Sequence, residues 1–451
     1  MAFTFKGGIH VPESKNTAGC KIEAIKAPAT VSIPMSQHIG APCEPTVKVG
    51  DAVKIGTVIG EVKAGLGAPI HSSVSGTVKA IVEKQSTQGN NVKHVVIDND
   101  GLDEIDESVK PCEKPITEMD AQEIMDKVKA GGIVGLGGAT FPTHAKIASA
   151  IGKVDKIIVN CAECEPYLTA NHRLLIEYPE YVVGGLKIFL KAVGVTTAYI
   201  AIEDNKPDAI KIVEDLVKDS DMISVKVMKT KYPQGDERQL IFALTGKELK
   251  QGQLPADAGC VIFNAETCAA TYNLFLTGMP LVKRVVTVDG DCVSEPKNLY
   301  VPLGTPFSYL IEQCGGLTKE VKRIVSGGPM MGVAQWDAEA PAAKGTSGVL
   351  VLSDEVVRKE SLPSACIRCG RCVKNCPMHL MPSYFAMFAA AGDFERAEKA
   401  GVMSCVECGT CTYNCPGRVQ IVQLIRTAKN AIRAEQAKAK AAAAANAAEK
   451  K

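Results

Sequence analysis

The sequence of 451 residues predicts a multidomain α/β protein. At roughly 150 residues per domain, this length predicts three or four domains. The hydrophobic pattern changes along the chain from short strands to alternating strands and helices, and then back to strands. Eight of the 17 cysteines then fall into two tight runs near the end. We therefore expect a β domain, an α/β domain, a second β domain and a cysteine-rich helical domain, in that order.

Composition excludes several classes of function. The net charge is +1 and only 5% of the residues are aromatic, so neither a basic field nor stacking side chains favour nucleic acid as a partner. No stretch reaches the roughly 18 consecutive apolar residues of a membrane helix, and residues 1–8 do not resemble a signal peptide. We therefore expect a cytoplasmic protein that reaches a membrane only through partner subunits.

The first domain is predicted over residues 28–110, after an N-terminal extended segment over 1–27. Segments 47–53 and 55–60 alternate apolar residues with turn-forming residues, which is typical of short strands. The pattern resembles the barrel-sandwich fold of biotinyl and lipoyl carrier domains. Their modified lysine would fall on Gly65 here, so we expect a carrier fold without a prosthetic group, used for docking.

The second domain, over 111–275, alternates helices and strands. A helix is predicted over 121–130, buried strands over 156–159 and 197–202, and an amphipathic helix over 209–217. Alternating strands and helices of this kind predict a mostly parallel sheet.

The rest of the chain divides into three parts. Residues 276–355 return to a β pattern, with a strand expected over 284–288. Residues 356–430 are predicted to be helical around the cysteine runs. The Ala/Lys-rich tail over 431–451 is expected to be either a frayed helix or disordered.

Each cysteine run has the spacing Cys-x2-Cys-x2-Cys-x3-Cys-Pro, which is that of bacterial ferredoxins. In that arrangement, three cysteines surround one [4Fe–4S] cluster and the fourth ligates the other cluster. The first cluster is thus predicted to use Cys366, Cys369, Cys372 and Cys415. The second is predicted to use Cys405, Cys408, Cys411 and Cys376. The alternative is zinc, which prefers two CxxC pairs separated by a longer loop.

A glycine-rich loop over 131–142 leads into a predicted helix that begins at Pro142, with Lys146 one turn further on. Glycine lets the backbone approach a phosphate closely, and a helix N-terminus attracts anions. The glycine order is not that of the ordinary dinucleotide fingerprint. The loop alone therefore predicts either a phosphate site or a tight structural turn.

The loop segment 135–143 resembles the FMN loop of the NADH-binding flavoprotein subunit of respiratory complex I. Three further segments resemble that family in the same order: 160–166, 232–237 and 264–267. The resemblance implies a Rossmann-like α/β domain that binds FMN non-covalently and uses NAD(H) as its substrate. It also implies that a β-grasp domain of the soluble-ligand-binding (SLBB) type follows.

The resemblance also implies a role for each matching residue. The FMN phosphate would be held by Gly135, Gly137, Gly138 and Lys146. The flavin and its ribityl chain would be held by Asn160, Asn264 and Thr267. The nicotinamide side would be lined by Glu163, Glu165, Asp236 and Glu237, next to Tyr232 and Gly235 of the same segment. Phe141 could stack on a ring of the dinucleotide. The alternative for the carboxylates is a solvated loop face.

Two features differ from the complex I pattern. Ala162 stands where that family has an aspartate, and segment 246–259 lacks Phe and Trp. We therefore expect the adenine to be bound more weakly than in complex I, or to be bound by other residues.

The order of domains along the whole chain resembles the C subunits of Rnf electron-transport complexes. This resemblance implies a peripheral subunit at the cytoplasmic face of the cell membrane. It would pass electrons between NAD(H), FMN and two [4Fe–4S] clusters. Its expected partners are the membrane subunits, which move Na⁺ or H⁺, and a ferredoxin-like B subunit, with ferredoxin as an indirect partner.

Two other hypotheses remain open. One is an electron-relay and docking subunit whose dinucleotide site has decayed. The other is a soluble enzyme of the same building blocks that delivers electrons to a small-molecule reductase.

Overall fold

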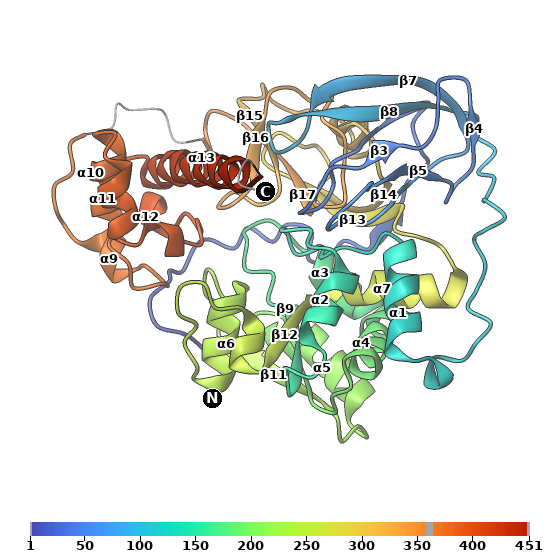
Figure 1. Ribbon diagram of the computed structural model, residues 1–451, viewed down its shortest axis with the longest axis horizontal. Helices are drawn as coiled ribbons and strands as arrows, with labels where there is room; N and C mark the ends of the chain where they lie inside the picture. Colours follow the sequence, from blue (N-terminus) through green and yellow to red (C-terminus); the bar gives the residue numbers. More distant parts are fainter. Residues whose placement is uncertain (1, 358–363, 449–451) are drawn as a thin grey trace.

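The computed structural model describes residues 2–357 and 364–448. The expected order of domains is confirmed (Figure 1). The α/β domain lies along one side of the molecule, the two β domains lie side by side above it, and the cysteine-rich helices lie at the end next to α6.

The N-terminal β domain consists of two small antiparallel sheets, in the strand orders β2-β8-β7-β4 and β3-β5-β6. Its core is a set of fully buried aliphatic side chains that includes Ile33, Ile59 and Ile97. Its strands are β2 (Thr30–Pro34), β3 (Glu44–Pro45), β4 (Ala52–Val53), β5 (Val58–Glu61), β6 (Ile70–His71), β7 (Gly76–Gln85) and β8 (Asn91–Asn99). β4 and β5 are shorter than the predicted segments because turns at Gly50 and Gly56, both with positive φ, interrupt the pattern.

The α/β domain has a four-stranded parallel sheet in the order β11-β10-β9-β12. Its strands are β9 (Lys156–Cys161), β10 (Ala198–Glu203), β11 (Ile223–Met228) and β12 (Cys260–Asn264). Its helices are α1 (Ala121–Ala130), α2 (Thr143–Ala150), α3 (Ala170–Glu177), α4 (Pro179–Val193), α5 (Pro207–Val217), α6 (Glu237–Thr245) and α7 (Ala265–Thr277), with 3-10 turns at Ile116–Glu118 and Pro255–Ala258. The predicted helix over 121–130 is confirmed. A capping box between Asp120 and Glu123 starts it, and it ends at Gly131.

Helices α4 and α7 pack unusually closely in this domain. A Cβ atom placed on Gly185 of α4 would lie 1.9 Å from the Cys268 carbonyl oxygen of α7. The glycine inside α4, which lowers intrinsic helix propensity, is therefore required by the close approach of the two helices.

The second β domain has a six-stranded sheet in the order β1-β14-β13-β17-β15-β16. Its strands are β1 (Ile22–Ala24), β13 (Lys283–Asp289), β14 (Lys297–Pro302), β15 (Arg323–Ser326), β16 (Val333–Gln335) and β17 (Gly348–Leu352), and its helix is α8 (Phe307–Gln313). β1 comes from the N-terminal segment and pairs in parallel with β14. Residues 22–24 of the N-terminal segment are thus part of this sheet.

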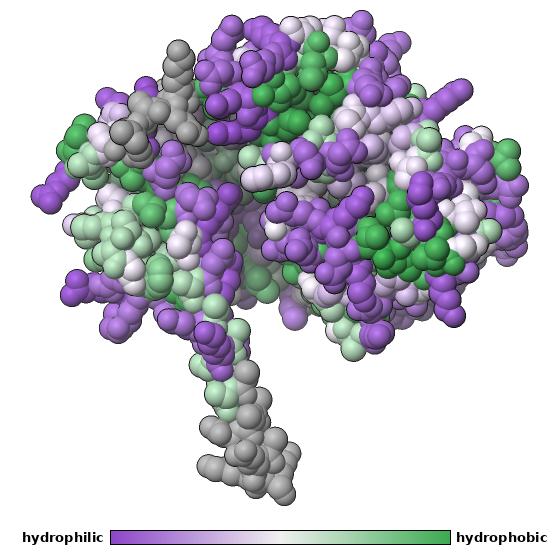
Figure 2. All heavy atoms as spheres, turned by 90° about the horizontal axis from the view of Figure 1, so that it is seen from above, coloured by the Kyte–Doolittle hydropathy of each residue, from purple (hydrophilic) through white to green (hydrophobic). Residues whose placement is uncertain are grey.

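The helical domain contains α9 (Arg371–Lys374), α10 (Pro382–Ala390), α11 (Phe394–Lys399), a 3-10 turn (Val402–Ser404), α12 (Thr410–Tyr413) and α13 (Ile421–Ala448). Helix α13 crosses the predicted start of the tail at residue 431, and Ile432 is buried in the domain core. Residues 433–440 are exposed, and this end of α13 projects from the body of the molecule (Figure 2). Of the two alternatives for the tail, the structure shows a helix as far as residue 448. Within the described ranges, no helix has the length and apolarity that crossing a bilayer requires.

The N-terminal segment crosses the α/β domain and contacts the helical domain before it reaches β14 (Figure 1). The Phe3 amide donates to Val227 O at the sheet edge, and the Gly8 amide donates to Asn375 O at 3.0 Å. Gly7 has a φ of +77° and lies so close that a Cβ atom would be 2.7 Å from Cys376 O. The segment therefore fixes the helical domain against the α/β domain.

Three domains meet around the fully buried side chain of Lys344. Its ammonium group donates to Pro69 O of the first domain at 2.9 Å and to Gly132 O of the α/β domain at 2.7 Å. No carboxylate accepts a hydrogen bond from it among the described residues. Burial consequently lowers the pKa of Lys344 to about 7. The side chains of His38, His71 and Cys43 lie near it, and burial also lowers the pKa of both histidines.

We predict that Lys344 makes stability depend on pH above neutrality. Its pKa is about 7 in the folded protein and close to 10.5 when unfolded, so between these values the unfolded chain binds more protons. Stability therefore rises with pH in this window, by up to about 1.4 kcal/mol per pH unit. In Lys344→Met this contribution is absent. Urea unfolding at pH 7, 8 and 9 should show a smaller rise for Lys344→Met than for wild type. Lys153→Met, which changes an exposed lysine, should behave like wild type; equal slopes for all three proteins would contradict the assignment.

Candidate functional site

The parallel sheet changes winding direction between β9 and β12. From β9 the chain moves to β10 on one side, and it returns later to place β12 on the other side. In parallel α/β sheets, ligands bind at the carboxyl ends of the strands at such a switch point. Asn160, the last but one residue of β9, is in direct register with Asn264 at the end of β12. The structure therefore brings two of the predicted flavin-binding residues together at the expected edge.

The glycine loop lies at the same edge. The Leu136 amide donates to the Thr267 hydroxyl at 2.9 Å, and Gly137 is so close to Asn264 that a Cβ atom would lie 3.3 Å from the asparagine Cβ. Gly137 and Gly138 are exposed. The Asn264 side-chain oxygen accepts from the Glu266 amide and so caps α7, whereas its side-chain nitrogen lies beside Gly137 and donates to none of the described residues. The loop thus presents exposed glycine backbone next to a free amide donor.

The neighbours of the loop hold its shape. The Gly135 amide donates to Phe141 O at 2.9 Å, and the half-buried Phe141 leads into α2. Helix α2 begins at Thr143, one residue later than predicted, so Pro142 precedes the helix. Lys146 donates to Ile262 O of β12 at 3.0 Å, and burial lowers its pKa. The lysine therefore lies at the switch-point edge, with its ammonium group on a backbone carbonyl.

Segment 232–235 closes the other side of this edge. The Asn160 side-chain amide donates to Gly235 O at 2.7 Å, and the Ala162 amide donates to the Asn160 side-chain oxygen at 3.2 Å. Gly235 faces Ala162 and Cys164 so closely that a Cβ atom would lie 3.4 Å from the Cys164 sulfur. Burial raises the pKa of Cys164 well above its ordinary range, so its thiol stays protonated and unreactive.

Two of the predicted nicotinamide carboxylates cap helices. Glu163 accepts from the backbone amides of Asn171 and His172 at the start of α3, at 2.7 and 3.1 Å. Asp236 accepts from two amides at the start of α6, and burial raises its pKa to about 6. Both carboxylates thus complement the positive ends of helices.

The other two predicted carboxylates differ in exposure. Glu165 accepts from the amides of Met330 and Met331, at 3.0 and 2.8 Å, in the turn between β15 and β16. Burial raises the pKa of Glu165 to about 7. Glu237 is exposed in the first turn of α6. The alternative of a solvated loop face therefore applies to Glu237 but not to Glu165. The Glu165 carboxylate instead joins the α/β domain to the second β domain.

Two lysines outside the motifs, the half-buried Lys15 and the buried Lys206, support the acidic loop. Lys15 of the N-terminal segment donates to three carbonyls, those of Glu163, Glu165 and Leu168, at 2.6–2.8 Å. Lys206 donates to Ala162 O at 2.7 Å and pairs with Glu203. Sequence reasoning missed both, because lysines in a polar segment and a surface turn give no signal of burial.

Gln234 is a further residue that the sequence did not single out. Its side chain is completely buried, yet neither its amide nitrogen nor its oxygen has a partner among the described residues. Buried amides are almost always paired with protein, water or a bound group. Gln234 lies directly before Gly235, so this unsatisfied amide fits the presence of a bound polar group near the sheet edge.

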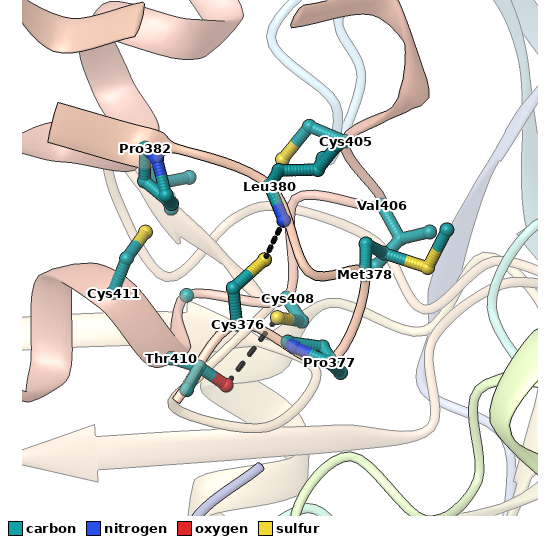
Figure 3. A pocket seen from close by; sticks show the side chains of 12 residues that line it. Cys376, Pro377, Met378, Leu380, Pro382, Cys405, Val406, Cys408, Thr410 and Cys411 are labelled. Carbon is teal, nitrogen blue, oxygen red and sulfur yellow. Dashed lines mark hydrogen bonds between the residues drawn. The ribbon is translucent and has the colours of Figure 1, made fainter. Parts of the chain in front are cut away.

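The second cysteine run forms one wall of a pocket. Cys376, Cys405, Cys408 and Cys411 surround a common space together with Leu380 and Pro382 (Figure 3). The backbone amides of Leu380 and Glu407 point at the sulfurs of Cys376 and Cys405, at 3.4 and 3.3 Å. Within the described ranges, no three His, Cys, Asp or Glu side chains converge on a single metal-ion position.

The donor set of this pocket fits an iron–sulfur cluster. It supplies thiols from both runs, in the crossed combination that the spacing predicts, and backbone N–H groups directed at sulfur tune such clusters. Burial raises the pKa of Cys405 to about 12, so the positive charge of bound iron would be needed to keep this thiol deprotonated.

The four remaining cysteines of the two runs do not line this pocket, and we call them the outer set. Cys366 and Cys369 are exposed, whereas Cys372 and Cys415 are half-buried against the domain core. They belong to the segments on either side of the first pocket. The ligands predicted for the first cluster are thus more open to solvent than those predicted for the second.

A direct hydrogen bond joins the sheet edge to the cysteine pocket. The buried Tyr232 hydroxyl donates to Cys408 O at 2.7 Å. Three residues later, Gly235 accepts the hydrogen bond from Asn160. One short segment therefore contacts the switch point at one end and a predicted cluster ligand at the other.

Four protein families match successive parts of the chain. Residues 3–102 match the RnfC barrel sandwich hybrid domain, 128–273 the Nuo51 FMN-binding domain, 285–334 the SLBB domain and 365–421 the 4Fe-4S dicluster domain. Among solved structures, the fold resembles a chain of an NAD⁺-reducing [NiFe]-hydrogenase in the H2-reduced state. The TM-score is 0.50 at 20% identity, over 69% of this chain and 62% of the other.

Curated relatives match almost the entire chain. The C subunit of the Na⁺-translocating ferredoxin:NAD⁺ oxidoreductase complex of Acetobacterium woodii is 48% identical, over 96% of this chain and 98% of its own length. The corresponding subunit of the proton-translocating complex of Clostridium ljungdahlii is 44% identical, over 98% and 97%. That of the ion-translocating oxidoreductase complex of Rhodobacter capsulatus is 40% identical, over 97% and 85%. The chain therefore belongs to the family of C subunits of Rnf ion-translocating oxidoreductase complexes.

Proposed function

We propose that this chain is the peripheral subunit that exchanges electrons between NAD(H), non-covalently bound FMN and two [4Fe–4S] clusters in an Rnf ferredoxin:NAD⁺ oxidoreductase. The names of its relatives support this, because they describe subunits of ferredoxin:NAD⁺ oxidoreductases. The observation that carries the proposal is segment 232–235, which contacts the sheet edge through Gly235 and the cysteine pocket through Tyr232.

The residues at the switch point fit a flavin mononucleotide. Exposed glycine backbone at Gly137 and Gly138 would admit the phosphate, together with Gly135 and Lys146. Asn160, Asn264 and Thr267 lie within one cluster of contacts and would hold the flavin and its ribityl chain. When bound, FMN supplies the step that converts a two-electron hydride transfer into single-electron transfers. The protein's own part is to hold the flavin and the nicotinamide in register.

For NAD(H), we propose that Phe141 stacks on a ring of the dinucleotide and that Glu237 contacts its ribose or amide. The carboxylates of Glu163, Glu165 and Asp236 accept hydrogen bonds from backbone amides. These three residues would therefore shape the wall of the nicotinamide site and would not bind the dinucleotide directly. Carboxylates repel phosphates, so the pyrophosphate would lie on the glycine-loop side.

The two sets of cysteines would form a short electron path. The pocket of Cys376, Cys405, Cys408 and Cys411 lies next to Tyr232 and receives or gives electrons on the flavin side. The outer set of Cys366, Cys369, Cys372 and Cys415 faces the partners. We propose that these partners are the membrane subunits that move Na⁺ or H⁺ and a ferredoxin-like B subunit, with this chain at the cytoplasmic face of the membrane.

A second candidate function is an electron-relay and docking subunit with a decayed dinucleotide site. Ala162 replaces the aspartate of the complex I pattern, and three of the four expected nicotinamide carboxylates already accept hydrogen bonds from backbone amides. A site with only Glu237 free would bind NAD(H) weakly. The two candidates differ in whether NADH reduces the bound flavin.

An anaerobic titration separates the two functions. The purified chain with reconstituted clusters should contain one FMN and about eight iron atoms. Added NADH should bleach the flavin absorbance and partly reduce the clusters. Irons without FMN, and no bleaching by NADH even with added FMN, would establish the relay function instead.

Gly137→Val tests the phosphate cradle. Even a single Cβ atom at this position lies 3.3 Å from Asn264, so the branched side chain should fill the space that the phosphate approaches. We expect the affinity for FMN to fall by at least about tenfold, which corresponds to a loss of roughly 1.4 kcal/mol in binding free energy. FMN is measured by its absorbance after release from the protein. In the control Gly19→Val, the new Cβ has no atom within 4 Å, and FMN should remain bound. Full retention of FMN by Gly137→Val would refute the loop assignment.

Cys366→Ser tests the separation of the two cofactor sites. Loss of one ligand from the outer set should lower the iron content by up to half. NADH should still bleach the flavin, because the exposed Cys366 belongs to the set that the proposed electron path reaches last. Iron analysis and the visible spectrum report the two effects separately. Cys20→Ser replaces a cysteine outside both runs and should change neither. Loss of flavin bleaching in a Cys366→Ser protein that retains FMN and its circular dichroism would contradict separate sites.

A further inference from the structure

Gln234 lies inside the segment that closes the sheet edge, and its side chain is 0% exposed. On one side of it, Tyr232 exchanges two backbone hydrogen bonds with Ile9, both at 2.8 Å. On the other side, Gly235 O accepts from the Asn160 side chain at 2.7 Å. Hydrogen bonds to two different parts of the chain therefore fix the backbone before and after Gln234.

The side chain of Gln234 carries an unpaired donor and an unpaired acceptor. Neither its Nε2 nor its Oε1 has a hydrogen-bond partner among the described residues. Buried amides are almost always paired, because an unpaired one loses its hydrogen bonds to water without replacement. Gln239 shows the ordinary case, since it is also buried and its Nε2 donates to Met378 Sδ at 3.3 Å. The two unpaired atoms of Gln234 therefore point to a ligand that pairs with both.

These two atoms also select the chemical class of the ligand. A glutamine Nε2 only donates hydrogen bonds, and its Oε1 only accepts them. A phosphate or a carboxylate offers acceptors alone, so it would leave Oε1 unpaired. A carbonyl next to an N–H group pairs with both atoms at once, in two antiparallel hydrogen bonds. The pyrimidine ring of a flavin and the carboxamide of nicotinamide both contain this arrangement.

The neighbourhood of Gly235 suits an uncharged ligand group. A Cβ atom on Gly235 would lie 3.6 Å from Ala162 Cβ and 3.4 Å from Cys164 Sγ. Ala162 stands where the complex I pattern has an aspartate, which in its ionised form only accepts hydrogen bonds. One residue from this contact, Gln234 instead supplies a neutral side chain that both donates and accepts. The polar group at this edge thus matches an amide and not a cation.

We infer that Gln234 is a ligand-binding residue that pairs with the adjacent carbonyl and N–H groups of the flavin pyrimidine ring or of the nicotinamide carboxamide. This inference rests on the proposed function, in which FMN and NAD(H) bind at this sheet edge. Two antiparallel hydrogen bonds permit a single in-plane orientation of the partner, so Gln234 fixes how the bound ring is turned. Its role is recognition, and it transfers neither a proton nor a hydride.

Flavin binding tests the first source of the amide group. The full chain, with its clusters reconstituted and its FMN removed, is titrated with FMN and with FMN methylated at the nitrogen between the two pyrimidine carbonyls. Quenching of flavin fluorescence gives each dissociation constant. If the pyrimidine is the partner, wild type should bind FMN at least about tenfold more tightly than the methylated flavin. Gln234→Met keeps the length of the side chain without its polar atoms, so this preference should fall to about twofold or less.

Dinucleotide binding tests the second source. The FMN-loaded chain is titrated by calorimetry with NAD⁺ and with acetylpyridine adenine dinucleotide, in which a methyl group replaces the amino group of the carboxamide. If nicotinamide is the partner, wild type should prefer NAD⁺ by at least about tenfold, and Gln234→Met should lose this preference. Its preference between the two flavins should then stay as in wild type. Loss of preference in either series supports the inference and identifies the partner ring.

Gln239→Met is the matched control, because it removes a buried glutamine amide that already has a partner. It should keep the wild-type preferences in both series. Urea unfolding of the ligand-free chains separates recognition from a structural role. Gln234→Met breaks no hydrogen bond within the described protein, so without ligand its unfolding midpoint should be no lower than that of wild type.

Two results would overturn the inference. One is that Gln234→Met keeps the wild-type preferences in both series. The other is that the ligand-free variant unfolds at clearly lower urea concentration than wild type, which would make Gln234 a structural residue. Failure of the proposed function looks different. If wild type binds FMN but not NAD⁺, the NAD(H) function fails, and the flavin series alone decides the role of Gln234. If wild type binds neither, the function and the inference fail together.

Discussion

The structure depends on buried cations that satisfy the carbonyl groups of irregular backbone. Loops that pass through a protein interior leave carbonyls without ladder partners, and such groups must be paired. Here Lys15 binds three carbonyls of the loop after β9, Lys344 binds one carbonyl from each of two other domains, and Arg284 reaches Leu136 O and the carboxylate of Glu266. These contacts join separately folded sheets. The domains are therefore held by a few directional interactions as well as by apolar packing.

This arrangement explains why the switch point can serve as a site. The carboxyl edge of a parallel sheet is lined by loops, and here each loop is fixed by another element: the glycine loop by Thr267, the acidic loop by Lys15 and segment 232–235 by Asn160. Pre-positioned polar groups lose little entropy when a ligand binds. Tyr232 of the same segment donates to Cys408 O, so one hydrogen-bonded segment joins the sheet edge to the cysteine pocket.

Sequence patterns predicted those parts of the protein that depend on local spacing. The two cysteine runs, the helix over 121–130 and the parallel sheet follow from spacing and periodicity, and the pair of asparagines on β9 and β12 follows from the resemblance to the complex I flavoprotein subunit. The capping roles of Glu163 and Asp236 were missed because a carboxylate in a motif looks the same whether it faces a ligand or a helix end. Lys15 and Lys344 could not be identified, because their hydrogen bonds join segments that lie far apart in the sequence.

The N-terminal segment has a consequence for the order in which the protein assembles. Gly7 and Gly8 lie against Cys376 and Asn375, yet the ribosome makes these two glycines long before it makes their partners. Domains generally fold as units during synthesis, and contacts between distant segments form late because closing a long loop costs entropy. The central domains can therefore form while the first residues are still free. The contacts of Gly7 and Gly8 with residues 375 and 376 can form only after the helical domain has been synthesised, so they join the beginning of the chain to its last domain.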